Sequence, residues 1–336
     1  MKKILLSENK KFFKANLHTH STVSDGVLTP EELKEVYKSM GYSIVAYTDH
    51  DVLVPHPELT DENFLALNGF EMEFNNAPHL DFHYELVKST HFCSIALDPE
   101  NLVQPCWNLA EVPTPSRKSV KDVKFDPTLP PFIRKSTPEC ISEAMKICRE
   151  KGFFVTYNHP NWSIDDYNDY TNYNNMHAME ICNWVSYLCG LNDLNNEREY
   201  DDMLRAGKRI YCLATDDCHA KEHCGGGFTV INAENLEYKT ITNALIDGNF
   251  YASTGPEIFN LWFEDGILHV ECSKAKRIAL GTMVRNGGCV MANDGEYLTS
   301  ADFKIDKRHT YVRISITDEN GNMAHTNAYF TDELFA

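Results

Sequence analysis

Short apolar runs and amphipathic stretches alternate along the first 256 residues of the chain. Residues 12–17, 42–47 and 153–157 are mostly apolar runs of the length that buried strands have. Residues 29–41 and 137–152 begin with Thr-Pro, carry apolar residues at helical spacing and end at a glycine. Strands that alternate with helices predict an α/β fold with a largely parallel sheet. Further strands are predicted at 64–70, 91–97, 179–184 and 209–214, and further helices at 197–206 and 238–246.

The pattern changes after Pro256. Strand-like runs follow one another there without helical stretches, and Glu-Asp-Gly and Glu-Asn-Gly tripeptides supply turns. These strands are predicted at 258–263, 267–272, 277–280 and 311–317. We therefore predict two domains, with residues 1–256 as an α/β domain and residues 257–336 as a small antiparallel β domain. Residues from about 98 to 135 are rich in Pro and Lys without clear periodicity, which is typical of an insertion or a lid.

Composition limits the partners of the chain. Its 336 residues are 43% hydrophobic, enough for a large core, and carry a formal net charge of −18. Nucleic-acid backbones are bound mainly through Lys and Arg. A chain with this much negative charge is therefore not expected to bind them. The 11 cysteines are scattered without a Cys-x-x-Cys pair, which favours a reducing cytoplasm over a disulfide scaffold. Neither a signal-peptide core nor an apolar run of 18 residues is present, so no membrane segment is predicted.

Candidate metal ligands stand where the predicted strands end. His18 and His20 lie two residues apart on an extended stretch, and this spacing places both imidazoles on one face. Asp49, His50 and Asp51 end the next buried strand. Three titratable groups at such a position are costly unless they are paired or coordinated. Both strand ends therefore predict metal ligands rather than core residues.

Later strand ends repeat this arrangement. His159 precedes a proline, which favours an extended backbone, and Asp217 and His219 again stand two apart. Asp25 lies in a Ser-Asp-Gly turn that can return it to the same cavity. Glu71 ends a strand, and a carboxylate is the usual bridge between two cations. Catalytic residues of parallel α/β barrels collect at the carboxyl ends of the strands, so the sequence predicts one polynuclear metal site there.

These motifs, in this order, resemble those of the PHP (polymerase and histidinol phosphatase) superfamily. Residues 16–21 (Asn-Leu-His-Thr-His-Ser), 24–26 (Ser-Asp-Gly) and 48–51 (Thr-Asp-His-Asp) resemble its opening motifs. Its later motifs are matched by 69–71 (Gly-Phe-Glu), 158–160 (Asn-His-Pro) and 217–219 (Asp-Cys-His). The resemblance spans roughly residues 12–256. Residues 250–256 (Phe-Tyr-Ala-Ser-Thr-Gly-Pro) resemble the branch that contains carbamate hydrolases, in which a small β domain often follows.

The resemblance implies a distorted (β/α)7, TIM-like barrel that holds two or three divalent metal ions, typically zinc, manganese or iron. Transferred residue by residue, it implies one metal at His18, His20, Glu71 and Asp217, a second at Glu71, His91 and His159, and a third at Asp25, His50 and His219. His79 and His83 compete with His91 for their motif, and Glu73 competes with Glu71. We prefer His91 because it begins an apolar strand, as that motif should.

The predicted function is that of a metal-dependent phosphoesterase acting on a small, anionic substrate. A hydroxide that bridges two cations would attack phosphorus. Asp49 is a candidate partner of His50, and His20 or His219 would assist the leaving group. The alternative is a carbamate, ester or amide hydrolase at the same site. The net charge disfavours a nuclease or proofreading module, and the presence of all nine presumed ligands disfavours a non-catalytic binding protein.

Overall fold

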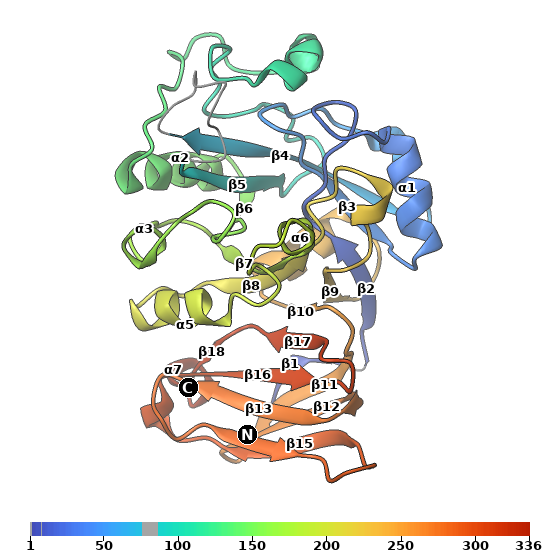
Figure 1. Ribbon diagram of the computed structural model, residues 1–336, viewed down its shortest axis with the longest axis vertical. Helices are drawn as coiled ribbons and strands as arrows, with labels where there is room; N and C mark the ends of the chain where they lie inside the picture. Colours follow the sequence, from blue (N-terminus) through green and yellow to red (C-terminus); the bar gives the residue numbers. More distant parts are fainter. Residues whose placement is uncertain (1, 8, 76–86) are drawn as a thin grey trace.

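Most of the strands belong to one large sheet. The computed structural model describes residues 2–7, 9–75 and 87–336. Eight strands of this sheet are neighbours in the order β9-β2-β3-β4-β5-β6-β7-β8, and β10 pairs with β9 (Figure 1). The bounds are β2 Lys11–Asn16, β3 Ile44–Tyr47, β4 Leu65–Asn75, β5 Ser89–Ala96, β6 Phe153–Tyr157, β7 Ala178–Asn183, β8 Tyr211–Thr215, β9 Phe228–Ala233 and β10 Phe250–Ser253.

The sheet is mixed rather than purely parallel. Strands β2, β3 and β4 are parallel neighbours, and so are β6, β7 and β8. Strand β5 runs antiparallel to both β4 and β6, and β9 runs antiparallel to β2. The predicted parallel arrangement is therefore interrupted at β5 and β9. His91 consequently lies near the start of its strand, while the other candidate ligands lie at or beyond the ends of theirs, apart from Glu71 within the long β4.

The hydroxyl of one side chain links strands β8 and β9 by hydrogen bonds. The Thr229 hydroxyl donates a hydrogen bond to the Ala214 carbonyl (3.0 Å) and accepts one from the Ala214 N–H (3.2 Å). Within residues 9–75 and 87–336, no backbone ladder joins these two strands. The fold is therefore a mixed α/β arrangement, and a closed barrel stays a prediction.

The predicted helix starts are confirmed. Thr29 and Glu32 form a capping box at the start of α1 (Pro30–Ser39), and the Thr137 side chain accepts from the Cys140 N–H at the start of α2 (Pro138–Glu150). Helices α5 (Glu197–Arg205) and α6 (Tyr238–Ile246) also match the sequence pattern. None of the helices in the described part of the chain is long and apolar enough to cross a membrane. The remaining helical segments are short: α3 Tyr167–Tyr170, α4 Trp184–Leu188, α7 Thr331–Leu334, and the 3₁₀ segments η1 Pro57–Leu59, η3 Thr114–Asp122, η4 Lys221–His223 and η5 Lys307–His309.

Antiparallel strands make up the C-terminal part, as predicted. Four of them form a second sheet in the order β1-β11-β12-β15, and the others extend the large sheet through β17, which pairs with β10. Strand β1 (Lys2–Leu6) pairs with β11, so the beginning of the chain lies in this C-terminal part (Figure 1). The bounds are β11 Ile258–Glu264, β12 Ile267–Ala275, β13 Arg277–Thr282, β14 Gly288–Met291, β15 Leu298–Lys304, β16 Tyr311–Thr317, β17 Met323–Thr326 and β18 Tyr329–Phe330.

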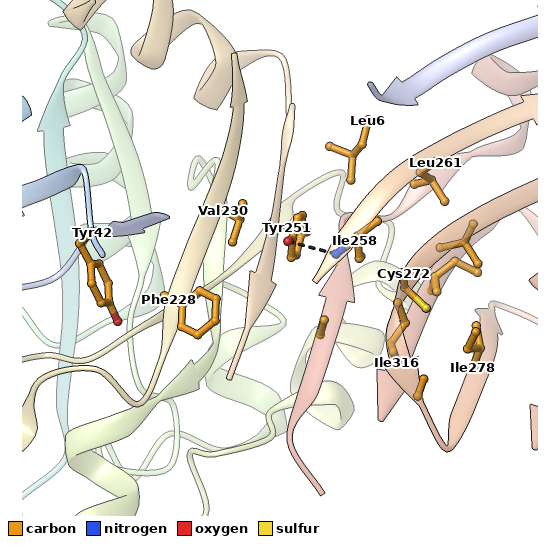
Figure 2. Close-up of a cluster of buried hydrophobic side chains, with 14 of the residues drawn as sticks. Leu6, Tyr42, Phe228, Val230, Tyr251, Ile258, Leu261, Cys272, Ile278 and Ile316 are labelled. Atoms are coloured by element: carbon orange, nitrogen blue, oxygen red, sulfur yellow. Dashed lines mark hydrogen bonds between the residues drawn. The ribbon is translucent and has the colours of Figure 1, made fainter. Parts of the chain in front are cut away.

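One hydrophobic cluster joins the two parts. Leu6, Ile258 and Ile316 are buried between the C-terminal sheets, and the same cluster continues to Phe228 on β9 (Figure 2). The Tyr251 hydroxyl on β10 accepts a hydrogen bond from the Ile258 N–H (3.1 Å), which fixes the chain where it leaves the large sheet. The predicted boundary between residues 256 and 257 thus marks a change of topology within a shared core.

A half-buried histidine beside the ladder between β6 and β7 predicts acid sensitivity. The His177 Nδ1 atom accepts a hydrogen bond from the Val155 N–H (3.0 Å), and its ring stacks on Phe154. Burial, with a smaller contribution from Arg149, lowers the pKa of His177 to about 3. The unfolded chain binds this proton near pH 6.5 and the folded chain does not, so stability is lost as the pH falls below 6.5.

We expect the free energy of unfolding to fall by about 2–3 kcal/mol from this residue between pH 7 and pH 4.5, at about 1.4 kcal/mol per pH unit. The measurement is urea unfolding at several pH values for the native chain and for His177→Gln, whose amide oxygen can accept the same hydrogen bond. The variant should lose less stability over this range. Equal pH slopes would show that His177 carries no such penalty.

Candidate metal centre

Glu71 on β4 lies at the centre of a group of imidazoles. Its carboxylate is 3.1 Å from His18 Nε2, 3.3 Å from His20 Nε2 and 3.1 Å from His50 Nδ1. His91 Nδ1 and His159 Nε2 follow at 3.3 Å and 3.4 Å. All of these side chains except His50 are almost completely buried. One carboxylate therefore has five imidazole nitrogens within 3.4 Å.

Asp217 provides a second carboxylate near His18 and His20. Its oxygens are 3.3 Å from His18 Nε2, 3.1 Å from His20 Nε2 and 3.9 Å from His159 Nε2. The His18 and His20 Nε2 atoms are themselves 3.1 Å apart. Glu71 and Asp217 thus each lie within 3.3 Å of both histidines of the first motif, and these are the four residues that the family resemblance assigns to one metal.

A third group lies nearer the solvent. The Asp25 carboxylate is 3.6 Å from His50 Nε2, 3.6 Å from His219 Nε2 and 3.8 Å from His20 Nδ1. Potential ligand atoms of His20, Asp25, His50 and His219 all lie within 4.8 Å of one another. Similar groups join His18, His159 and Asp217, and His50, Glu71 and His91. The structure therefore brings all nine predicted ligands into one cluster.

Several ligand atoms in the cluster are buried without a hydrogen-bond partner. Buried polar groups normally have one, since an unpaired group costs about 1–3 kcal/mol. These atoms belong to residues from separate segments of the chain that meet in the cluster, as ligands of a cation do. Within the described ranges they are His20 Nδ1, His50 Nδ1, His91 Nδ1, Glu71 Oε2 and Asp217 Oδ1.

The electrostatics of the cluster also fit cations. Burial alone would lower the pKa of His18, but Asp217, Glu71 and Glu180 raise it well above its usual value. Burial opposes ionisation of Glu71, yet His18 and the neighbouring imidazoles hold its pKa well below the usual range. Burial and His20 lower the pKa of His50 to about 4. Two fully buried carboxylates thus stay ionised and attract positive charge, which protons supply when no metal is bound.

The aspartates beside His50 have separate partners. The Asp49 carboxylate accepts hydrogen bonds from the N–H and hydroxyl groups of Ser21 and Ser24, at 2.7–3.1 Å. Asp51 pairs with the buried Arg134. These contacts explain how three titratable groups are tolerated at one strand end. The structure places Asp49 outside the ligand cluster, in a position that shapes the loop between His20 and Asp25.

The backbone around two ligands is unusual. Asp217 has φ of 53° and His159 has φ of 24°. The prediction of an extended His159 before Pro160 is therefore wrong. The His159 N–H donates to Glu180 Oε2 (2.9 Å), and this bond holds the residue in a conformation that the following proline disfavours. Strained backbone of this kind often accompanies a functional site.

Glu180 on β7 is a member of the site that the sequence analysis missed. It is fully buried, and its Oε1 contacts His18 Nδ1 (2.7 Å) and accepts from the Thr215 hydroxyl (2.6 Å). Its Oε2 accepts from the His159 N–H and from Asn183 Nδ2 (2.8 Å). The available signal was a glutamate inside an otherwise apolar strand, where an unpaired charge would be costly.

Asn158 and Asn183 complete the surroundings of the two carboxylates. Asn158 Nδ2 donates to Glu71 Oε1 (2.7 Å), and Asn183 Nδ2 contacts Asp217 Oδ2 (3.2 Å). These amides orient the carboxylates from behind, as outer hydrogen-bond partners of metal ligands do. The competing candidates His79 and His83 lie outside the described residues, and Glu73 lies beside the cluster, where its carboxylate accepts from Asn75 and Ser89.

A cavity of about 450 Å³ opens over the cluster. Its floor includes seven of the nine predicted ligands, all except His18 and His20. Pro113, Pro115 and Ser116 from the predicted insertion line its wall. Ser119 and Lys118 of the same segment donate hydrogen bonds to the carbonyls of Val23 and Ser24. The insertion is therefore packed against the loop that carries Asp25.

Comparison with known proteins yields structural neighbours only. No protein-family model matches the sequence, and no curated protein matches it. A two-domain protein from Bacteroides vulgatus that contains a predicted PHP-like metal-dependent phosphoesterase is 15% identical, with a TM-score of 0.45 over 97% of this chain and 98% of that one. A protein from Bifidobacterium adolescentis assigned as a metal-dependent phosphoesterase is 18% identical, with a TM-score of 0.39 over 70% and 96% of the two chains.

An amidohydrolase from Chromobacterium violaceum is 17% identical, with a TM-score of 0.35 over 61% of this chain and 87% of that one. The overall superpositions are thus loose, and the sequence identities are low. The superposition on the two-domain protein from Bacteroides vulgatus extends over nearly the whole length of both chains.

Proposed function

We propose that the protein is a metal-dependent phosphoesterase of the PHP superfamily, acting on a small molecule in the cavity above the cluster. The observation that carries the proposal is the convergence of five buried ligand atoms without hydrogen-bond partners in the described ranges. Imidazole and carboxylate ligands in this mixture suit zinc, manganese and iron. Residues 1–256 would form the catalytic domain and fold as a distorted (β/α)7 barrel.

The nine residues fit three cation positions that share ligands. His18, His20, Glu71 and Asp217 would hold the first cation, and Glu71, His91 and His159 the second. Asp25, His50 and His219 would hold the third, whose position is the most exposed. When bound, divalent cations polarise the phosphoryl oxygens, lower the pKa of water and neutralise charge that develops on the leaving oxygen.

The protein's own contribution is orientation and the exclusion of water. Glu180 holds His18 through Nδ1, so that Nε2 faces the cluster. The His219 Nδ1 atom lies 2.9 Å from the backbone carbonyl oxygen of Asp217. This contact leaves His219 Nε2 directed to Asp25. Asp49 fixes the loop that carries Asp25. As ligands, His20 and His219 would be weak proton donors to the leaving group.

One observation favours hydrolysis of a neutral carbamate, ester or amide as the alternative. Among the described residues, no Lys or Arg side chain lines the cavity, and phosphate sites commonly contain one. If the substrate is a phosphate ester, the cations alone would have to supply the positive charge. A neutral carbonyl substrate would need no further positive charge. The two reactions can be separated directly.

The test begins with protein stripped by a chelator and reloaded with zinc, manganese or iron. We expect two or three metal ions per chain by elemental analysis, and metal-dependent hydrolysis of p-nitrophenyl phosphate. Bis(p-nitrophenyl) phosphate and a p-nitrophenyl carbamate are measured beside it. Turnover of the carbamate alone would contradict phosphoesterase activity, and full activity of a His18→Ala, Asp217→Ala double variant would contradict the metal centre itself.

A further inference from the structure

Several apolar side chains line the cavity beside the cluster. Trp162 follows His159 in the chain, and its ring lies 4.9 Å from the His91 and His159 rings, measured between centroids. Pro113 and Pro115 of the insertion also line the cavity. Val185, in the short helix after β7, is a further apolar lining residue. A group bound over the cluster would therefore meet ring and alkyl surfaces, which favours an apolar group.

Among the described residues that line the cavity, there is no Lys or Arg to receive a second anionic group, and residues 76–86 contain neither residue type in the sequence. The imidazoles that line the cavity are those of four predicted ligands and of His223. Two basic side chains of the insertion form hydrogen bonds or ion pairs outside the cavity. Lys118 donates to the Ser24 carbonyl (2.9 Å), and Arg134 pairs with Asp51. Any positive charge for the substrate would come from the metal centre.

A further carboxylate also lines the cavity. Glu73, two residues beyond Glu71 on β4, would repel an anionic substituent on the substrate. Ser116 from the insertion also lines the cavity, but its side chain is completely buried and presents no accessible hydroxyl to a ligand.

The size of the cavity restricts the substrate further. Roughly 150 Å³ of apolar cavity accommodates benzene, so about 450 Å³ holds a phosphate and one ring with its substituents. We propose that the substrate is a phosphate monoester whose alcohol part is one uncharged, ring-sized group, packed against Trp162 and the insertion prolines. This inference rests on the proposed function and adds the substrate class to it.

Two matched probes test the proposal without turnover. The first is 4-carbamoylphenylphosphonate, and the second is 4-carboxyphenylphosphonate, which has nearly the same shape and one more negative charge. Calorimetric titration of the metal-loaded protein should show the amide binding about tenfold more tightly than the acid, or better, a difference of about 1.4 kcal/mol. Hydrolysis of the corresponding aryl phosphates should show the same preference in kcat/KM.

Substitutions test which residues cause the preference for the amide probe over the acid probe. Glu73→Gln should bring the two affinities to within about threefold of each other, because it removes the repulsion of the acid. Trp162→Leu should weaken both probes by a similar factor. Trp262→Leu on β11 is the matched control for the loss of an indole and should change neither affinity.

The outcomes separate this inference from the proposed function. If phosphate esters are hydrolysed but the acid probe binds as tightly as the amide, the substrate class is wrong and the phosphoesterase activity stands. The same conclusion follows if Trp162→Leu and Trp262→Leu behave alike. If no phosphate ester is hydrolysed and neither phosphonate binds to the metal-loaded protein, the proposed function is wrong, and the substrate class with it.

Discussion

Glu71→Gln is expected to abolish stable metal binding and to reduce phosphatase turnover by roughly 10²–10³-fold or more, as the loss of a single preorganised charged contact does in other enzymes. Both Glu71 oxygens face imidazole nitrogens, at 3.1–3.4 Å from five histidines. A glutamine has nearly the same shape, but it carries no charge and replaces one acceptor by an N–H₂ donor. Glutamine would therefore be a poorer ligand than glutamate for the divalent cations that the cluster is proposed to hold.

Metal content per chain by elemental analysis and kcat with p-nitrophenyl phosphate are the two measurements. Glu73→Gln is the matched control for metal content, because it makes the same chemical change two residues further along β4. The control should retain its metal, and Glu71→Gln should not. If Glu71→Gln kept its metal and Glu73→Gln lost it, the ligand would be Glu73, which competes with Glu71 in the sequence.

Thermal unfolding of the two metal-free variants distinguishes loss of metal from loss of fold. Glu71 is fully buried beside histidines that hold protons when no metal is present, so glutamine also removes a favourable charge pairing. We expect Glu71→Gln to be destabilised without metal, yet still to unfold in one cooperative transition. A variant that is unfolded at room temperature would indicate that the carboxylate is needed chiefly for folding.

The position of the site was predictable because its ligands lie at the ends of elements with clear local patterns. The helix starts at Thr29 and Thr137 and the buried strands before His50 and His159 can each be recognised from a few neighbouring residues. In an α/β fold, such strand ends meet at one end of the sheet. Local patterns and one topological rule were therefore sufficient to bring the ligands together.

What the sequence did not predict depends on contacts between distant segments. The residues of β1 pair with β11, more than 250 positions away, and nothing within Lys2–Leu6 identifies that partner. The reversed direction of β5 is likewise set by its neighbours in the sheet. Trp162 and Ser116 become wall residues only through the packing of the insertion and the loop after His159. A single sequence gives no register for such long-range pairings.

Glu180 was missed for a related reason. Metal ligands at strand ends can be recognised from their neighbours, whereas a carboxylate in the middle of a strand points either to solvent or to the interior. Only the fold shows that Glu180 points inward to His18 and the His159 backbone. The structure thereby adds a fully buried carboxylate that contacts the ligands without facing the centre of the cluster.

Glu180→Gln is expected to weaken metal binding by about 10–100-fold, while kcat at saturating metal changes by less than about tenfold. Glu180 Oε1 contacts His18 Nδ1 at 2.7 Å and so keeps Nε2 free to serve as a ligand. Its Oε2 accepts from the His159 N–H, which holds the strained backbone of the second ligand. Glutamine can keep one of these two acceptor positions but not both. Affinity is measured by competition with a chromogenic chelator, and kcat at excess metal.

Asp165→Asn provides the matched control, since it also neutralises a carboxylate inside the protein. Asp165 accepts hydrogen bonds from the hydroxyls of Thr90, Tyr157 and Tyr173. Its replacement should alter stability and leave the metal affinity unchanged. A purely structural role for Glu180 would lower the stability of both variants and the metal affinity of neither. If Glu180→Gln instead lost kcat at saturating metal as severely as Glu71→Gln, Glu180 would have to contact a cation or the substrate rather than position His18 and His159.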